Sequence, residues 1–265
     1  MICSDIDAHF RNIGTWVDWD NTADTFKAGD RASAVTKIAV GWKASFAALK
    51  LAHAHGAELF VSHESICVNA VNRSREPEVT FALPSELPKF QWLESTGMTV
   101  YRCHDVWDRV PGTGVRDSWQ RGLALGGDVV ADEYPLLVTE RESLSLRDLA
   151  DHILGRIASL GQEGLLVTGD PERKVSRIAT GTGVTTNPVA MRELGADVGV
   201  ITDDYYRRVR MGVHADELDF PTIMVNHGVS EAWGIENLAA HLREAFPEIE
   251  VMFIPYECPF RVQTA

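Results

Sequence analysis

The sequence predicts an α/β protein built from two similar halves, and three features of the chain support this fold class. Short apolar segments alternate with helical patterns, as in a sheet that has helices packed on it. A stretch that begins VTKIAVG at Val35 returns as VSRIATG at Val175. The 265 residues, 45% of them hydrophobic, are enough to bury a core without disulfides or structural metals.

The expected elements follow the order strand, helix, strand in each half. The helical stretch ends in Gly-Ala both times, at Gly56-Ala57 and at Gly195-Ala196, and a short apolar strand follows. The halves are expected to span residues 1–130 and 131–265 and to form one compact unit. We expect strands near 36–41, 58–62, 98–103, 176–180, 198–202 and 222–226, and amphipathic helices near 114–125 and 234–245.

The last of these strands in each half ends in a histidine, and a carboxylate follows four residues later. MTVYRCH ends at His104 and leads to Asp108, whereas TIMVNH ends at His227 and leads to Glu231. All α/β units share a strand-helix-strand order, so that order alone would not indicate a repeat. The shared V-x-x-I-A-x-G, Gly-Ala and His-x3-acid patterns favour an internal duplication.

The net charge and the spacing of the cysteines limit the classes of protein to which the chain could belong. The formal net charge of −13 weighs against nucleic-acid partners, which need a concentrated basic surface, and it suits a protein that binds divalent cations. The four cysteines lack C-x-x-C spacing, so we expect neither a disulfide framework nor a cysteine zinc site. We find no signal-peptide pattern and no apolar run long enough to span a bilayer, and therefore expect a cytoplasmic protein.

Five side chains are expected beyond the carboxyl ends of the predicted strands, where functional groups gather in α/β sheets. They are His63, Glu64, Asp108, His227 and Glu231. We expect all five at one edge of the sheet, with a metal site between the two halves. Each residue taken alone is more commonly a solvated loop residue, and only the convergence of five favours a joint site.

Histidine and carboxylate side chains bind borderline divalent metals such as Zn, Mn, Fe or Ni. Two histidines and three carboxylates suffice for two ions, with one carboxylate bridging them. Two ions about 3.5–4 Å apart polarise a carbonyl or phosphoryl oxygen and lower the pKa of a shared water. The residues therefore favour hydrolysis by a metal-bound hydroxide, and they leave the substrate open.

Five motifs along the chain resemble, in order and spacing, those of one known family. They are Trp19-Asp20-Asn21 followed by Gly29-Asp30; HESI (63–66); His104-x3-Asp108 with Pro111; GDPERKVSRIATGTG (169–183); and NHGVSE (226–231) with CPF (258–260). They resemble the WDN…GD, HHP, HTNLD…P, glycine-turn and GHxxxE…DPF motifs of the Nif-three-like family of dinuclear-metal hexameric proteins, often labelled GTP cyclohydrolase type 2. The resemblance spans nearly the whole chain.

The resemblance implies a Nif-three-like fold, a hexamer built as a trimer of dimers, and two divalent ions (Zn, Mn, Fe or Mg). Carried over residue by residue, the family's ligands fall on the five residues named above, with Glu231 as the bridge. Glu64 departs from the second histidine of HHP and adds a carboxylate, which favours Mn, Mg or Fe over Zn. Arg207 stands near a position where the family usually has histidine, which puts a substrate role there in doubt.

Four further groups carry alternatives that the sequence leaves open. His104 is predicted as a catalytic residue, through proton transfer or substrate contact, and a structural strand-end histidine is the equal alternative. Asp203 either orients a ligand or caps the next helix, and the cap is slightly favoured. The turn at 180–183 is favoured as a tight turn over an anion site. A basic-aromatic cluster lines either a substrate cavity or a subunit interface; it comprises Tyr205, Tyr206, Arg207, Arg208 and Arg210.

We therefore expect a dinuclear metal-binding protein, with metal-dependent hydrolysis of a small molecule as its function. The alternative is a non-catalytic metal-binding or regulatory assembly, because both kinds of protein need well-held ions. A catalytic site keeps open metal positions, whereas a structural site is closed.

Overall fold

The computed structural model describes residues 1–68, 82–204 and 217–263. The chain divides into two compact units, each assembled from two segments. Unit 1 is Met1–Gly114 with Gly234–Pro255, and unit 2 is Val115–Trp233 with Tyr256–Ala265. These units differ from the expected division at residue 130, because a strand near the end of the chain belongs to the sheet of unit 1.

Unit 1 contains a five-stranded sheet in the order β1-β4-β3-β2-β11. Its core strands β4, β3, β2 and β11 run parallel to one another, and β1 pairs antiparallel with β4 at the edge. The strands are β1 (Thr25–Ala28), β2 (Lys37–Lys43), β3 (Leu59–Glu64), β4 (Thr99–Arg102) and β11 (Glu250–Ile254). The central strands are buried almost throughout, as expected for a parallel sheet covered on both faces.

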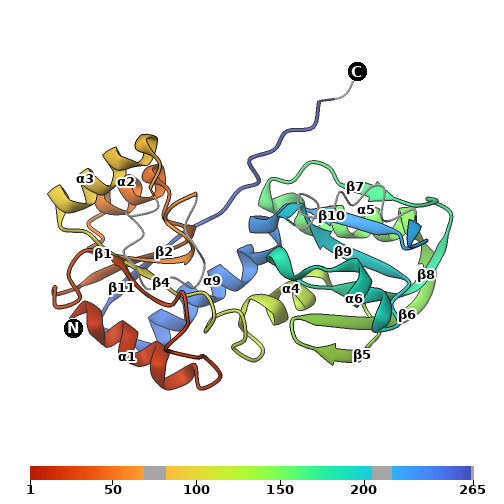
Figure 1. Cartoon of the computed structure of the whole chain (residues 1–265), viewed down its shortest axis with the longest axis horizontal. Helices are drawn as coiled ribbons and strands as arrows, with labels where there is room; N and C mark the ends of the chain where they lie inside the picture. The colour runs from red at the N-terminus through yellow and green to blue at the C-terminus, as the bar shows by residue number, and fades with distance from the viewer. Residues whose placement is uncertain (69–81, 205–216, 264–265) are drawn as a thin grey trace. The chain divides into compact units, whose positions relative to one another are not determined.

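Helices cover both faces of this sheet (Figure 1). The helices α2 and α3 lie on one face, and α1 with the later part of α9 lies on the other. They are α1 (Cys3–Ile13), α2 (Phe46–Ala54), α3 (Leu87–Thr96), which follows a 3₁₀ turn at Pro84–Glu86, and α9 (His227–Ala245). Ser45 caps α2, since its hydroxyl accepts the N–H of Ala48 at 3.1 Å.

Unit 2 contains a six-stranded sheet in the order β5-β6-β8-β9-β10-β7. Strands β8, β9 and β10 are parallel, whereas β6 and β7 pair antiparallel on either side of them. The strands are β5 (Asp128–Glu133), β6 (Leu136–Ser145), β7 (Leu166–Thr168), β8 (Lys174–Thr180), β9 (Val198–Thr202) and β10 (Thr222–Val225).

Two apolar cores lie on opposite faces of this second sheet. Helices α4 (Val115–Leu123) and α5 (Leu146–Ile157) pack into one core with β8, β9 and β10. The shorter α6 (Pro188–Glu193) packs on the other face through Met191. Single 3₁₀ turns occur at Ala158–Leu160 and Gly183–Thr185. Among the described residues no helix is long and apolar enough to cross a bilayer.

The two sheets share the strand order that the sequence repeat predicts. The order β1-β4-β3-β2 in unit 1 matches β7-β10-β9-β8 in unit 2, including the antiparallel edge strand. Ile38 is paired with Leu59, and the corresponding Ile178 is paired with Val198. The units differ beyond this core, since β11 is parallel to β2 but β6 is antiparallel to β8.

The structure confirms the α/β class and all six expected strands, and it corrects two expectations. The five predicted site residues do not share one sheet edge, because the chain forms two sheets rather than one. The helix expected at 234–245 begins at His227 instead, so the second histidine opens a helix. The helix expected at 114–125 is α4.

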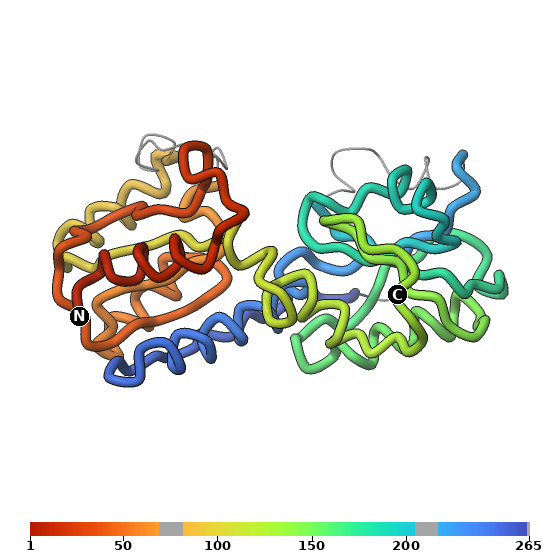
Figure 2. Tube along the Cα trace, turned by 90° about the horizontal axis from the view of Figure 1, so that it is seen from below, coloured from red at the N-terminus to blue at the C-terminus, as the bar shows by residue number. Residues whose placement is uncertain are grey.

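Helices α1 and α9 lie side by side in unit 1 (Figure 2). A pair of histidines links the two helices. The Nε2 atoms of His9 and His241 are 2.8 Å apart, so one ring donates a proton and the other accepts it. The His241 ring packs on Trp107, and Phe246 lies edge-on to His9. Burial lowers the pKa of both histidines, and the neighbouring ring lowers that of His9 further. Glu244 opposes the shift at His241.

We expect the free energy of unfolding to fall as the pH drops below about 6.5, the pKa of an unfolded histidine. In that range His9 and His241 bind protons in the unfolded chain but stay neutral in the folded protein. The free energy of unfolding therefore falls by at most about 1.4 kcal/mol per histidine and per pH unit. Urea unfolding at pH 7.5 and 5.5, with a chelator present, measures the loss. His241→Gln should reduce it, whereas His55→Gln, at an exposed site, should not; equal losses in both variants would contradict this explanation.

Candidate metal centre

In unit 1, two neighbouring parallel strands end in polar side chains. His63 and Glu64 are the last residues of β3, and Arg102 is the last residue of β4. Ser62 is paired with Arg102, so both strands end at the same level of the sheet. The loop after β4 then carries His104 and Asp108. These groups gather at the carboxyl edge of the sheet, where α/β proteins bind ligands.

The tautomer of His63 is fixed by the neighbouring strand end. The side chain is fully buried, and its Nδ1 lies 3.0 Å from the carbonyl oxygen of Cys103. Because a carbonyl only accepts hydrogen bonds, Nδ1 carries the proton and Nε2 carries the lone pair. That Nε2 lies 3.4 Å from Oδ1 of Asp108. A histidine held in this way is oriented as metal-binding histidines are, with the second nitrogen hydrogen-bonded to the protein.

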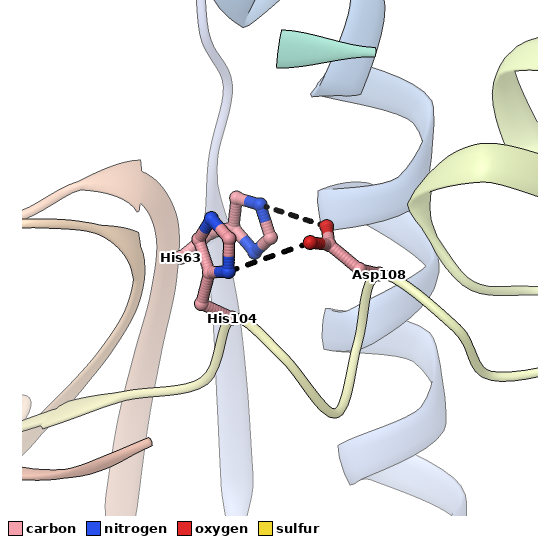
Figure 3. A group of neighbouring side chains, drawn as sticks. All are labelled: His63, His104 and Asp108. Atoms are coloured by element: carbon pink, nitrogen blue, oxygen red, sulfur yellow. Dashed lines mark ion pairs between the residues drawn. The ribbon is translucent and has the colours of Figure 1, made fainter. Parts of the chain in front are cut away.

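His104 and Asp108 complete a compact group with His63 (Figure 3). The two imidazole rings stack with centroids 4.6 Å apart and planes 10° from parallel. Asp108 faces both rings, with Oδ1 toward His63 and Oδ2 3.4 Å from Nδ1 of His104. Each of the three residues offers a ligand atom within 4.8 Å of the others.

Glu64 is held against a buried arginine. Arg102 is 1% exposed, and its Nη2 lies 3.2 Å from Oε2 of Glu64. The same arginine donates from Nε to the carbonyl oxygen of His63 at 3.0 Å. Oε2 of Glu64 also accepts the N–H of Ser65, and Oε1 lies 3.7 Å from Nε2 of His104. The Glu64 carboxylate, at the position of the second histidine of HHP, is therefore paired with the guanidinium of Arg102.

The carboxylates around His104 favour its protonated form. Burial would lower the pKa of His104, but the carboxylates of Asp108, Asp105 and Glu64 outweigh burial and the opposing charge of Arg102, and raise the pKa to about 10. A metal ion and a proton are both positively charged, so this group of carboxylates attracts either one. Metal binding to His104 would therefore displace a proton.

Asp24 holds the loop that carries His104. Its buried carboxylate accepts three backbone N–H groups: those of His104 at 2.7 Å and Asp105 at 2.9 Å on Oδ1, and that of Val106 at 2.8 Å on Oδ2. Burial raises the pKa of Asp24, whereas His104 and the N–H donors lower it. The start of the loop after β4 is thus fixed by a residue that precedes β1.

We expect Asp24→Asn to weaken both the fold and the metal site. An amide has one acceptor oxygen, so at least one of the three buried N–H groups loses its partner, at about 1–3 kcal/mol. Because the loop positions His104 and Asp108, we expect metal affinity to fall about 10–100-fold. Urea unfolding and competition with a chromophoric chelator measure the two effects. Glu94→Gln, an exposed acid-to-amide change on α3, is the control, and an unaltered metal affinity in Asp24→Asn would refute the role of Asp24.

In unit 2, His227 and Glu231 lie one turn apart at the start of α9. Nε2 of His227 is 3.0 Å from Oε1 of Glu231, which is 3% exposed. On the other side of the ring, Nδ1 lies 2.9 Å from Oδ2 of Asp204. In metal-binding histidines, one ring nitrogen is commonly hydrogen-bonded to a carboxylate while the other faces the metal site. The His227 ring has this arrangement.

Asp203 positions His227 through the backbone. Its Oδ1 accepts the N–H of His227 at 2.8 Å, and its Oδ2 accepts Nδ2 of Asn226 at 2.8 Å. Asn226 in turn accepts the hydroxyl of Tyr256 at 2.7 Å. Asp203 therefore holds the first residue of α9 and orients His227 through the backbone.

Gly183 lies directly against this pair. Its φ is +53°, and a Cβ atom at this position would be 3.0 Å from Nε2 of His227 and 3.1 Å from Oε1 of Glu231. Glycine is therefore required both by the backbone and by the close approach. The turn at 180–183 serves the packing around the histidine, as the tight-turn interpretation expects.

We expect Gly183→Ala to lower metal affinity at least about tenfold, since the methyl group would displace His227 or Glu231 from their contact. Gly126→Ala is the matched control, because Gly126 has a φ of +73° in the same unit and no atom within 4 Å of its added Cβ. Both variants share the cost of left-handed backbone, about 1 kcal/mol. Isothermal titration with Mn²⁺ measures the affinity, and equal losses in the two variants would rule out the steric effect.

The donor spacings fit divalent metals. Two atoms about 2.1 Å from one ion are about 3.0 Å apart at a 90° angle, about 3.4 Å apart in a tetrahedron and about 3.6 Å apart at 120°. His227 and Glu231 are 3.0 Å apart, and His63 and Asp108 are 3.4 Å apart. The structure thus brings His63 and Asp108 together in unit 1, and His227 and Glu231 together in unit 2.

Sequence reasoning missed the side chains that orient these groups. Asp24, Arg102, Asp105 and Asp204 give no spacing signal, because their partners are either distant in the chain or simple neighbours. His104, which the sequence predicts as a catalytic residue, lies beside His63 and Asp108 in a group that could hold a metal ion. The basic-aromatic cluster at 205–210, including Arg207, lies outside the described residues.

One family model matches nearly the whole chain. Residues 6–259 match the family described as Duf34/NIF3 (NGG1p interacting factor 3). None of the curated proteins matches the chain. Solved structures share the fold at low identity, which by itself indicates the fold alone. A hypothetical protein from Staphylococcus aureus has a TM-score of 0.78 and 17% identity, covering 99% of each chain.

Two further structures extend this likeness. A Bacillus cereus protein related to NIF3 has a TM-score of 0.79 and 13% identity, again covering 99% of both chains. HcgD from Methanocaldococcus jannaschii, in its reduced form, has a TM-score of 0.67 and 14% identity, covering 96% of this chain and 97% of that one. The fold therefore extends over the whole of each relative.

Proposed function

We propose that this chain, which belongs to the Duf34/NIF3 family, binds two divalent metal ions and uses them to hydrolyse a small molecule. The observation that carries the proposal is how two histidines are hydrogen-bonded and oriented. His63 and His227 each have Nδ1 hydrogen-bonded to a fixed acceptor and Nε2 within 3.4 Å of a carboxylate oxygen. Histidines prepared in this way are ready to donate to a metal without rearrangement.

We propose further that all five predicted residues are metal ligands. His227 and Glu231 alone give a metal two donors, whereas even catalytic zinc sites use three protein ligands. The family resemblance supports the same set, His63, Glu64 and Asp108 with His227 and Glu231, and Glu231 as the bridge. The ions are Zn, Mn, Fe or Mg, and the three carboxylates favour the harder ions among these.

Two bound ions would polarise a substrate carbonyl or phosphoryl oxygen and lower the pKa of a water. The residues of this chain have separate parts in that chemistry. The carbonyl of Cys103 and the carboxylate of Asp204 orient His63 and His227. Asp24 fixes the loop that bears Asp108, and Gly183 limits the space beside His227. The matched family description names no cyclohydrolase activity.

The rival proposal is a non-catalytic metal-binding or regulatory assembly. A metal-loaded protein tested against nucleotides, cyclic amides and phosphoesters separates the two. We expect two metals per chain by elemental analysis, and hydrolysis of one substrate class that falls at least about 100-fold in His227→Ala. The carboxylate change Glu231→Ala should act in the same way.

His55→Ala is the control, because His55 is exposed and lies outside the ligand groups. Unchanged metal content in both His227→Ala and Glu231→Ala would show that the site is elsewhere. Two tightly held metals without hydrolysis of any class would favour the non-catalytic rival.

We extend the proposal to the assembly and its place in the cell on the family resemblance and the sequence. The chain is proposed to form a homohexamer, a trimer of dimers, in the cytoplasm. Its substrate is proposed to be a small molecule rather than a nucleic acid, since the net charge of −13 repels phosphate backbones.

A further inference from the structure

We infer that unit 2 holds a further binding site, for a small apolar carboxylate, in a cavity beside β10. The cavity has a volume of about 450 Å³, which lies within the range of small-molecule sites. It is lined by residues 162–166, which lead into β7, by residues 224–226 at the end of β10, and by residues between 258 and 262. The site goes beyond the proposed function, and only its link to His227, argued last, rests on that function.

The walls of the cavity are largely apolar. Its buried part includes Met224, Val225 and Cys258. Three further lining side chains are more than half exposed, namely Leu166, Phe260 and Val262 at 63%, 58% and 55%. Single exposed apolar residues are common on protein surfaces, whereas several that gather around one cavity indicate a binding surface.

The buried polar side chains at the cavity are already hydrogen-bonded within the protein. Gln162 accepts the N–H of Asn226 and donates to the carbonyl of Gly164, both at 3.0 Å. Asn226 donates to Asp203 at 2.8 Å and accepts the hydroxyl of Tyr256 at 2.7 Å. These groups gain little from a polar ligand, so we expect the body of the ligand to be apolar.

Arg261 determines the polar end of the ligand. Its Nη1 donates to the carbonyl oxygens of Cys258 at 3.1 Å and Phe260 at 3.0 Å, which holds the exposed guanidinium at the cavity. Within residues 82–204 and 217–263, these bonds leave Nε and Nη2 for a carboxylate, which binds such a fork in a bidentate way. The exposed Glu163 also lines the cavity and opposes an anion, so the two charges give tests of opposite sign.

The cavity also contacts the residues that hold His227. Asp203 and Asn226 line it, and Asp203 accepts the backbone N–H of His227 at 2.8 Å. A ligand that packs against these two side chains restricts the residues that position His227. Ligand binding and metal binding should therefore strengthen each other, because the second to bind meets a site that the first has already ordered.

The charge preference is tested by isothermal titration of the full-length protein with naphthoate after treatment with a chelator, so that no metal takes part. We expect naphthoate to bind about three- to fivefold more tightly than uncharged naphthamide. Arg261→Gln should remove this preference, Arg261→Lys should keep part of it, and Glu163→Gln should strengthen naphthoate binding. Arg147→Gln, at an exposed arginine of the same unit, is the matched control. Equal binding of the two probes to the wild-type protein would overturn the role of Arg261.

The place of binding is tested at exposed wall residues, where a substitution leaves the core intact. Leu166→Ala and Phe260→Ala should each lower the affinity for naphthoate about three- to tenfold through lost apolar contact. Leu51→Ala, at an exposed leucine of unit 1 that does not line the cavity, is the matched control. Absence of naphthoate binding, or equal affinities in all these variants, would overturn the site. If sedimentation showed instead that Phe260→Ala dissociates an oligomer that binds no naphthoate, the surface would be a subunit contact and the inference would be wrong.

The link to His227 is tested by titrating Mn²⁺ with and without naphthoate. We expect naphthoate to raise the affinity for Mn²⁺ about fivefold in the wild-type protein and less in Phe260→Ala. An equal rise in both would mean that naphthoate binds the metal directly, and would overturn the link. No Mn²⁺ binding by the wild-type protein would overturn the proposed function, while the metal-free titrations would still decide the cavity site.

Discussion

The hydrogen bond from His63 Nδ1 to the carbonyl of Cys103 ties the ends of two parallel strands together, and the candidate site of unit 1 depends on it. It forms only because β3 and β4 pair with Ser62 opposite Arg102. Side chains alternate along a strand, so a slip of one residue would turn His63 to the other face. The buried run from Leu59 to His63 resists that slip, because both faces of the strand are packed.

Both units hold a histidine in the same way just after a repeated strand. The strand is β4 in unit 1, where a loop follows, and β10 in unit 2, where a helix follows. A carboxylate accepts the backbone N–H of the histidine: Asp24 does so for His104, and Asp203 does so for His227. The two carboxylates come from different places, one before β1 and one after β9. The requirement has thus been met twice by different residues, since buried backbone N–H groups at such a turn need acceptors.

The sequence allowed the core strands and the ligand types to be predicted, because both depend on local patterns. Apolar runs mark β3, β4, β9 and β10, and the His-x3-acid motif marks each strand end. Short β1 and β7 carry too few residues for a pattern, and exposed β5 does not alternate clearly. The pairing of β11 with β2 joins segments more than 200 residues apart, which no local signal specifies.

The orienting residues were beyond prediction for a related reason. Asp24 contacts a loop about 80 residues away, and a lone buried Asp resembles any turn residue in the sequence. Gly183 appears as an ordinary tight-turn glycine until a Cβ is placed against His227. Ligand residues are recognisable because metals restrict the chemistry of their ligands, whereas many different groups can hold a ligand in place.

Glu64 and Arg102 form an ion pair at the ends of two neighbouring strands. Arg102 is 1% exposed and lies between the carbonyl of His63 and the carboxylate of Glu64. Returning a histidine to position 64 alone would take that carboxylate from a buried guanidinium, and breaking one side of a buried pair costs about 3–5 kcal/mol. Glu64→His on its own would therefore confound metal preference with loss of stability. A change at position 64 is consequently coupled to Arg102, the β4 residue that neutralises Glu64, so the two neighbouring strand ends are energetically linked.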